Sequence, residues 1–151
     1  MSCARLREYL DEHRIRYVSM KHSPAYTAQE VAAAAHIPGQ EVAKTVVVKL
    51  DGDLALVVLP APEMVRFNHL KAETGADEVD LASEEEFKGH FPDCEVGAMP
   101  PFGNLYDLET YVQESLTRDE EIAFNAGTHT DLIRMSFADF QDLVNPRVLH
   151  S

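Results

Sequence analysis

Three segments of the 151-residue sequence combine residue types that could bind an anion or polarise a carbonyl group. Lys44 begins an apolar, β-branched run, and a lysine in such a place must reach solvent or an anion. Gly97 and Gly103 bracket Pro100-Pro101 in a stiff loop, whose backbone N–H groups could point at a ligand carbonyl or phosphate. His129 lies in a turn between two expected strands and could hydrogen-bond a substrate.

Each of these segments also has an ordinary structural interpretation. A lysine at the mouth of a strand can extend along the surface to water, and a Gly- and Pro-rich loop can be a plain rigid turn. A lone histidine in a turn is more often solvated than functional. From the residues alone, both kinds of interpretation stay open.

General catalytic and metal-binding motifs are absent from the sequence. It contains no GxGxxG, GxxxxGK[ST], HExxH or GxSxG pattern. Its seven histidines include no pair at helical ligand spacing, so we expect no metal site. Cys3 and Cys94 form no CxxC pattern and suggest neither a disulfide scaffold nor a zinc ribbon. A reaction catalysed by this chain would therefore depend on positioning and electrostatics rather than on a side-chain nucleophile.

Taken in order, the segments resemble one known family. The matching stretches are HSPAYTAQEVA at 22–32, AKTVV at 43–47, GAMPPFG at 97–103 and AGT at 126–128. They resemble the YbaK/prolyl-tRNA synthetase-associated domain family, and the resemblance covers about residues 5–145. Members of that family hydrolyse the ester between a wrong amino acid and tRNA. They include free-standing editing proteins and the editing insertion of bacterial prolyl-tRNA synthetase.

The resemblance implies roles for particular residues. The implied catalytic residues are Lys44, near the terminal adenosine and its phosphate, and Gly97 and Pro101, at the ends of the Gly-x-x-x-Pro loop that holds the ester. The implied substrate-binding residues are His22, Thr27, Met99, Phe102, Gly103, Gly127, Thr128 and His129. Helix 27–36 and the turn before it would form one wall of the pocket, so Tyr26 is a further candidate, for which a packed aromatic is the better interpretation. The family uses no metal or cofactor, and its mechanism recruits a substrate hydroxyl or a positioned water.

Hydrophobic periodicity and capping residues predict the elements that must position these groups. Helices are expected at 4–13, 27–36, 63–74, from Ser83 onward, and at 136–144. Strands are expected at 17–20, 45–50, 54–59, 77–81, 105–116, 121–125 and 132–135. An Asp51-Gly52 turn joins the second and third strands as a hairpin, covered on both faces, and a polar turn at 117–119 joins 105–116 to 121–125.

These elements predict an α+β fold for a single domain over residues 1–151. The expected architecture is a mixed, mostly antiparallel sheet or partial barrel surrounded by helices, as in YbaK-like proteins. No run approaches the ~20 apolar residues of a membrane span, and no charged start leads into an apolar signal segment. We therefore expect a soluble, cytoplasmic protein with no membrane partner.

The net charge of −13 is distributed unevenly and bears on the partners. Residues 1–71 contain nine basic and eight acidic residues, whereas residues 72–151 contain four basic and eighteen acidic ones. This balance argues against DNA and against general nucleic-acid binding, which depends on Lys and Arg. The near-neutral half, which includes Lys44, can still meet the acceptor 3′ end of a mischarged tRNA, with an aminoacyl-tRNA synthetase as a further possible partner.

The leading hypothesis is a metal-independent aminoacyl-tRNA deacylase that acts in trans, on a small amino acid attached to a proline tRNA. The alternative is a non-catalytic binding or regulatory module of the same fold that contacts a synthetase or another protein, to which the acidic half is suited. A third hypothesis is hydrolysis of small free aminoacyl esters. The sequence does not identify the amino acid or the tRNA.

Overall fold

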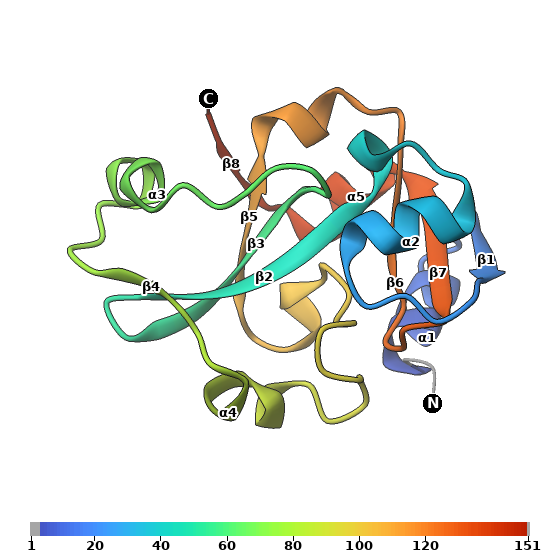
Figure 1. Ribbon diagram of the computed structural model, residues 1–151, viewed down its shortest axis with the longest axis horizontal. Helices are drawn as coiled ribbons and strands as arrows, with labels where there is room; N and C mark the ends of the chain where they lie inside the picture. Colours follow the sequence, from blue (N-terminus) through green and yellow to red (C-terminus); the bar gives the residue numbers. More distant parts are fainter. Residues whose placement is uncertain (1–3, 151) are drawn as a thin grey trace.

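The computed structural model of the protein describes residues 4–150, in which two β-sheets are covered by helices (Figure 1). Cys3 lies outside the described residues. The helices are α1 (Ala4–Glu12), α2 (Ala28–Ala35), α3 (Phe67–Thr74), α4 (Glu84–Phe87) and α5 (Phe137–Val144). The strands are β1 (Tyr17–Lys21), β2 (Ala43–Leu50), β3 (Asp53–Pro60), β4 (Val79–Leu81), β5 (Glu109–Gln113), β6 (Glu121–Asn125), β7 (Asp131–Ser136) and β8 (Arg147–Leu149). No helix of residues 4–150 is long and apolar enough to cross a membrane.

The larger sheet has the strand order β4-β2-β3-β5-β8, and the smaller one has the order β1-β7-β6. Four strand pairs are antiparallel, while β3–β5 and β5–β8 are parallel, so the predicted mixed, mostly antiparallel character is confirmed. An isolated bridge between Val42 and Ala123 links the two sheets. Within the described chain the sheets do not close into a barrel.

The β2–β3 hairpin is the longest strand pair and forms as the sequence predicts. Its register runs from Ala43 opposite Pro60 to Leu50 opposite Asp53, around the Asp51-Gly52 turn. The two faces of the hairpin are covered by different elements: Leu70 of α3 packs in the cluster of Val48 and Val57, and Phe87 of α4 packs in that of Val47 and Leu56. Figure 1 shows α3 and α4 on either side of the β4 end of the sheet.

Helix α2 carries the predicted capping box. The Thr27 hydroxyl accepts a hydrogen bond from the Glu30 backbone N–H, and the Glu30 carboxylate accepts one from the Thr27 N–H. Val31 and Ala32 of the helix pack with Ala123 of β6 and Leu132 of β7, and Figure 1 shows α2 in front of these two strands. The start of α2 is therefore fixed beside the ends of the smaller sheet.

The predicted strand at 105–116 is wrong in extent and in connection. Only Glu109–Gln113 are extended, and 3-10 helices occupy Gly103–Leu105 and Glu114–Arg118. The segment at 117–119 is not a hairpin turn, because β5 and β6 belong to different sheets and the Glu114–Arg118 helix carries the chain from one sheet to the other. Helix α3 begins four residues later than predicted, at Phe67, and β8 has no counterpart among the predicted strands.

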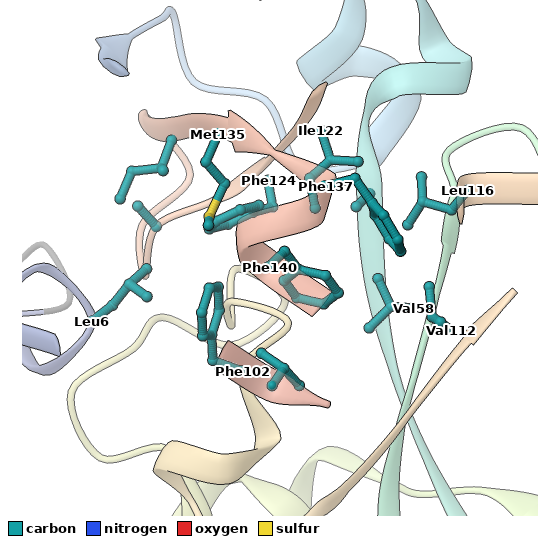
Figure 2. Packing of buried hydrophobic residues seen from close by; sticks show 14 of the residues in the cluster. Leu6, Val58, Phe102, Val112, Leu116, Ile122, Phe124, Met135, Phe137 and Phe140 are labelled. Carbon is teal, nitrogen blue, oxygen red and sulfur yellow. The ribbon is translucent and has the colours of Figure 1, made fainter. Parts of the chain in front are cut away.

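The main core lies where α5 packs against both sheets (Figure 2). Phe102 is fully buried there, with its ring centroid 5.5 Å from that of Phe124 and 5.4 Å from that of Phe140. Phe102 was expected to bind substrate from the family resemblance. Its side chain packs among core aromatics and holds the end of the Gly-Pro-rich loop in place, and the substrate-binding role stays a prediction.

Gly103 follows Phe102 and is held by a close approach of the backbone. A Cβ atom at this position would lie 2.5 Å from the Leu108 carbonyl oxygen and would also collide with the Thr110 hydroxyl. These contacts give Gly103 a packing role, and the substrate contact that the resemblance implies stays a prediction.

We predict that Gly103→Ala destabilises the protein by about 1–3 kcal/mol, because the added methyl group overpacks this site. At about 2–4 °C per kcal/mol for a chain of this size, thermal unfolding followed by circular dichroism measures the effect directly. Gly89→Ala is the matched control, since a Cβ atom there meets nothing within 4 Å. Equal melting temperatures for the two variants would contradict the assigned packing role.

Candidate functional site

A cavity of about 170 Å³ lies where the start of β2, the end of β6, the residues around the start of α2 and the Gly-Pro-rich loop meet. It is lined by Tyr26, Ala28, Val42, Ala43, Lys44, Thr45, Gly97, Met99 and Asn125. The structure thus brings together three of the residues singled out in the sequence, Lys44, Gly97 and Met99, although more than fifty residues separate the lysine from the loop.

Lys44 is the second residue of β2 and is half-buried at the cavity wall. Its Nζ donates a hydrogen bond to the Ala61 carbonyl oxygen at 3.1 Å, just beyond the end of β3. Burial lowers the pKa of the Lys44 ammonium, and the negative charge of Glu63 raises it. The lysine is therefore held by a backbone acceptor and a nearby carboxylate, and not loosely extended into solvent.

Glu63 is itself fixed by two hydrogen bonds. Its backbone N–H donates to the Pro60 carbonyl oxygen at 3.0 Å, and the Ser115 hydroxyl donates to its Oε2 at 2.6 Å. Sequence reasoning assigned Glu63 only to the start of a helix and did not single out Ser115. The pair is separated by 52 residues along the chain, so no local pattern could have indicated it.

Backbone hydrogen bonds join the Gly-Pro-rich loop to the turn between β6 and β7. The Glu95 N–H donates to the Gly127 carbonyl oxygen at 2.7 Å, and the Gly127 N–H donates to that of Ala98 at 3.0 Å. The Glu95 carboxylate also accepts a hydrogen bond from the His129 N–H at 2.8 Å. The loop and the turn, which the sequence marked separately, thus form one unit at the edge of the cavity.

Gly97 adopts a left-handed backbone conformation, with φ of 87°. A Cβ atom there would lie 3.4 Å from Cε1 of His129, so glycine suits both the conformation and the close packing. The Gly97 N–H points at the Met99 sulfur, 3.2 Å away. Because a thioether is a weak acceptor, a ligand carbonyl oxygen would be a stronger partner for this N–H.

Two polar atoms at the cavity have no hydrogen-bond partner among the described residues. They are the Thr45 hydroxyl oxygen and Oδ1 of Asn125, and both are buried. Since buried polar atoms are nearly always paired, such atoms around one cavity indicate a polar ligand. Sequence reasoning missed both as site residues, although Thr45 stands within the stretch 43–47 and Asn125 directly precedes the stretch 126–128.

The other expected site residues lie around this cavity or away from it. His129 is beside it, with its Nε2 donating to the Val96 carbonyl oxygen at 3.0 Å. Thr27 is exposed and caps α2, while the Thr128 hydroxyl donates to Asp131 at 2.7 Å. Five further expected residues do not line the cavity, namely His22, Pro101, Phe102, Gly103 and Gly127. Residues 4–150 contain no group of three or more His, Cys, Asp or Glu side chains arranged to hold a metal ion.

Comparison with known proteins places the chain in a family. Residues 22–143, which are most of the chain, match the family model of the aminoacyl-tRNA editing domain. The protein therefore belongs to the aminoacyl-tRNA editing domain family, which confirms the resemblance found in the sequence.

Two curated relatives are bacterial proline–tRNA ligases. The ligase of Bacillus mycoides (strain KBAB4) is 36% identical over 81 residues, which make up 54% of this chain and 14% of the ligase. That of Staphylococcus saprophyticus is 34% identical over 88 residues, or 58% of this chain and 15% of the ligase. The match thus spans less than a sixth of the length of either relative.

Solved structures share the fold over almost the whole chain. The hypothetical protein APE2540 has a TM-score of 0.84 at 21% identity, over 95% of this chain and 96% of that one. A candidate trans-editing enzyme for prolyl tRNA synthetase has a TM-score of 0.81 at 21% identity, over 97% of this chain and 93% of that one. These likenesses confirm the predicted YbaK-like α+β fold.

We predict that Glu63→Gln lowers the pKa of Lys44, because the substitution removes the negative charge that raises it and leaves the desolvation in place. The Lys44 side-chain resonances in a pH titration by NMR measure this value. Glu84→Gln, which removes a carboxylate in the first turn of α4, is the matched control and should leave Lys44 unchanged. An unaltered Lys44 titration in Glu63→Gln would show that the carboxylate does not act on the lysine.

Proposed function

We propose that the protein is an aminoacyl-tRNA deacylase that acts in trans and hydrolyses the ester of a mischarged tRNA. The observation that supports this most strongly is the single cavity that Lys44, Gly97 and Met99 share with the unpaired atoms of Thr45 and Asn125. It combines the Lys44 cation, the Gly97 backbone N–H and polar side chains around a space for a small polar group. Because the chain belongs to the aminoacyl-tRNA editing domain family, we propose that this group is the ester of an aminoacyl-tRNA.

The size of the cavity supports a small amino acid as the group removed. A volume of about 170 Å³ is below the roughly 300–1,000 Å³ of pockets that bind drug-sized ligands, so the cavity suits a small group. An alanyl ester has six non-hydrogen atoms in its acyl group and ester oxygen, whereas a large aromatic amino acid has many more. With proline–tRNA ligases among the relatives, we propose a small amino acid on a proline tRNA as the substrate.

The proposed mechanism is electrostatic and needs no covalent enzyme intermediate. The Gly97 N–H would turn from the Met99 sulfur to the ester carbonyl oxygen and stabilise the charge that develops there. Lys44 would bind the phosphate of the terminal nucleotide and hold the ester in place. A water molecule, positioned by the neighbouring ribose hydroxyl, then attacks the carbonyl carbon and loses a proton, and the ester C–O bond breaks. The released ribose oxygen takes up the proton, so that free amino acid and tRNA result.

Charge limits how the protein meets tRNA. Residues 72–151 carry eighteen acidic residues against four basic ones, which repels the phosphates of the tRNA body. We therefore propose that contact is confined to the acceptor 3′ end, and that an aminoacyl-tRNA synthetase supplies the remaining tRNA contacts in the cytoplasm. No metal or other cofactor takes part in the proposed reaction.

We predict that Lys44→Ala slows deacylation about 10²- to 10³-fold, the effect of removing one preorganised electrostatic group from an active site. The assay measures single-turnover hydrolysis of proline tRNA that has been mischarged with alanine, serine or cysteine. Lys49→Ala is the matched control, since Lys49 lies on the same strand and pairs with Glu86 at 2.6 Å. If the wild-type protein hydrolyses none of these esters faster than buffer does, or if Lys44→Ala equals wild type, the proposal is wrong.

The acidic half favours one second candidate, a non-catalytic module that binds a basic surface on a synthetase or another protein. Such a module would co-purify with a stable protein partner and would leave every mischarged tRNA intact. Hydrolysis of small free aminoacyl esters, the third hypothesis, requires equal rates on tRNA-linked and minimal esters.

A further inference from the structure

Tyr26 is an aromatic residue that the fold leaves exposed at the edge of the site. It precedes the α2 cap and is 68% exposed, while its ring borders the 170 Å³ cavity. The expectation that Tyr26 is a packed aromatic is therefore wrong. An exposed ring of this size beside a ligand cavity is a surface on which another flat, apolar group can stack.

One side of the Tyr26 ring is supported by His129. The two ring centroids are 4.7 Å apart, with an angle of 47° between the planes. His129 is fixed by two hydrogen bonds. Its backbone N–H donates to the Glu95 carboxylate, and its Nε2 donates to the Val96 carbonyl oxygen. The tyrosine thus leans on a histidine that is held in place, which reduces the entropy that it would lose when a ligand stacks on it.

A second cavity, of about 400 Å³, also borders this ring pair. Its lining includes Tyr26 and His129 together with three charged residues, Lys21, Glu95 and Asp131. The Lys21 ammonium pairs with the Asp131 carboxylate at 2.9 Å. The carboxylate of Glu95, which is exposed, has no lysine partner in this lining. The cavity is thus unsuited to a phosphate, and its carboxylate oxygens suit the amino groups that adenine and cytosine present.

The first cavity is too small for an aminoacyl group and a nucleoside together, so the nucleoside of the substrate must lie outside it. The ring shared by both cavities is Tyr26. We propose that Tyr26, supported by His129, is the stacking platform for a nucleobase of the unpaired 3′ end of tRNA, and that the second cavity receives this base. This inference rests on the proposed function for the identity of the ligand.

The test uses the full chain and the RNA trinucleotide 5′-CCA-3′ as a probe, with binding followed by NMR. We expect the backbone resonances of Lys21, Tyr26 and His129 to shift on titration. Base–aromatic stacking contributes enough affinity that Tyr26→Leu should bind the probe about 5- to 150-fold more weakly. Tyr26→Phe keeps the ring and should bind within about twofold of wild type; circular dichroism checks that both variants are folded.

Kinetics with mischarged tRNA separates this inference from the proposed function. If the ester is hydrolysed, Tyr26→Leu should raise KM by a larger factor than any change in kcat. Probe binding that depends on Tyr26, without hydrolysis of any ester, would support the nucleobase site and contradict the deacylase. If the wild-type protein hydrolyses the ester, and Tyr26→Leu has the same probe affinity and the same KM as wild type, the nucleobase site is wrong and the deacylase proposal stands.

Discussion

The site depends on holding one lysine half-buried at the start of the β2–β3 hairpin. An ammonium group withdrawn from water is costly unless acceptors and a counter-charge surround it. The Ala61 carbonyl provides the acceptor for Lys44, and Glu63 provides the charge. Both come from the segment that follows β3, so the length and register of the hairpin determine where the lysine meets its partners.

The second half of the site depends on backbone pairing between two irregular segments. The Gly-Pro-rich loop has no strand or helix of its own at Gly97, and its place is set by hydrogen bonds of Glu95 and Ala98 with Gly127. Phe102 anchors the end of the loop in the main core. The start of β2 and the Gly-Pro-rich loop thus come together from different parts of the chain. The Thr45 hydroxyl oxygen and Oδ1 of Asn125, which line the cavity between them, have no hydrogen-bond partner among the described residues.

Local patterns were enough to predict much of this arrangement. The Thr27 capping box and the Asp51-Gly52 hairpin are encoded by neighbouring residues, and both form as predicted. The grouping of Lys44 with Gly97 followed from a family resemblance, because no periodicity relates positions so far apart. The contact of Glu63 with Ser115 and the exposure of Tyr26 depend on tertiary packing, which the sequence pattern does not report. The strand predicted at 105–116 failed for the same reason, since the chain there crosses between two sheets as a 3-10 helix.

The central claim is that the cavity between Lys44 and Gly97 binds the ester end of an aminoacylated nucleotide. The most direct measurement is a crystal structure with a non-hydrolysable alanyl-adenosine in which an amide replaces the ester. We expect the alanyl group inside this cavity, with its carbonyl oxygen accepting a hydrogen bond from the Gly97 N–H and its polar groups bonded to Thr45 or Asn125. An analogue bound elsewhere on the surface, with this cavity unchanged, would contradict the account.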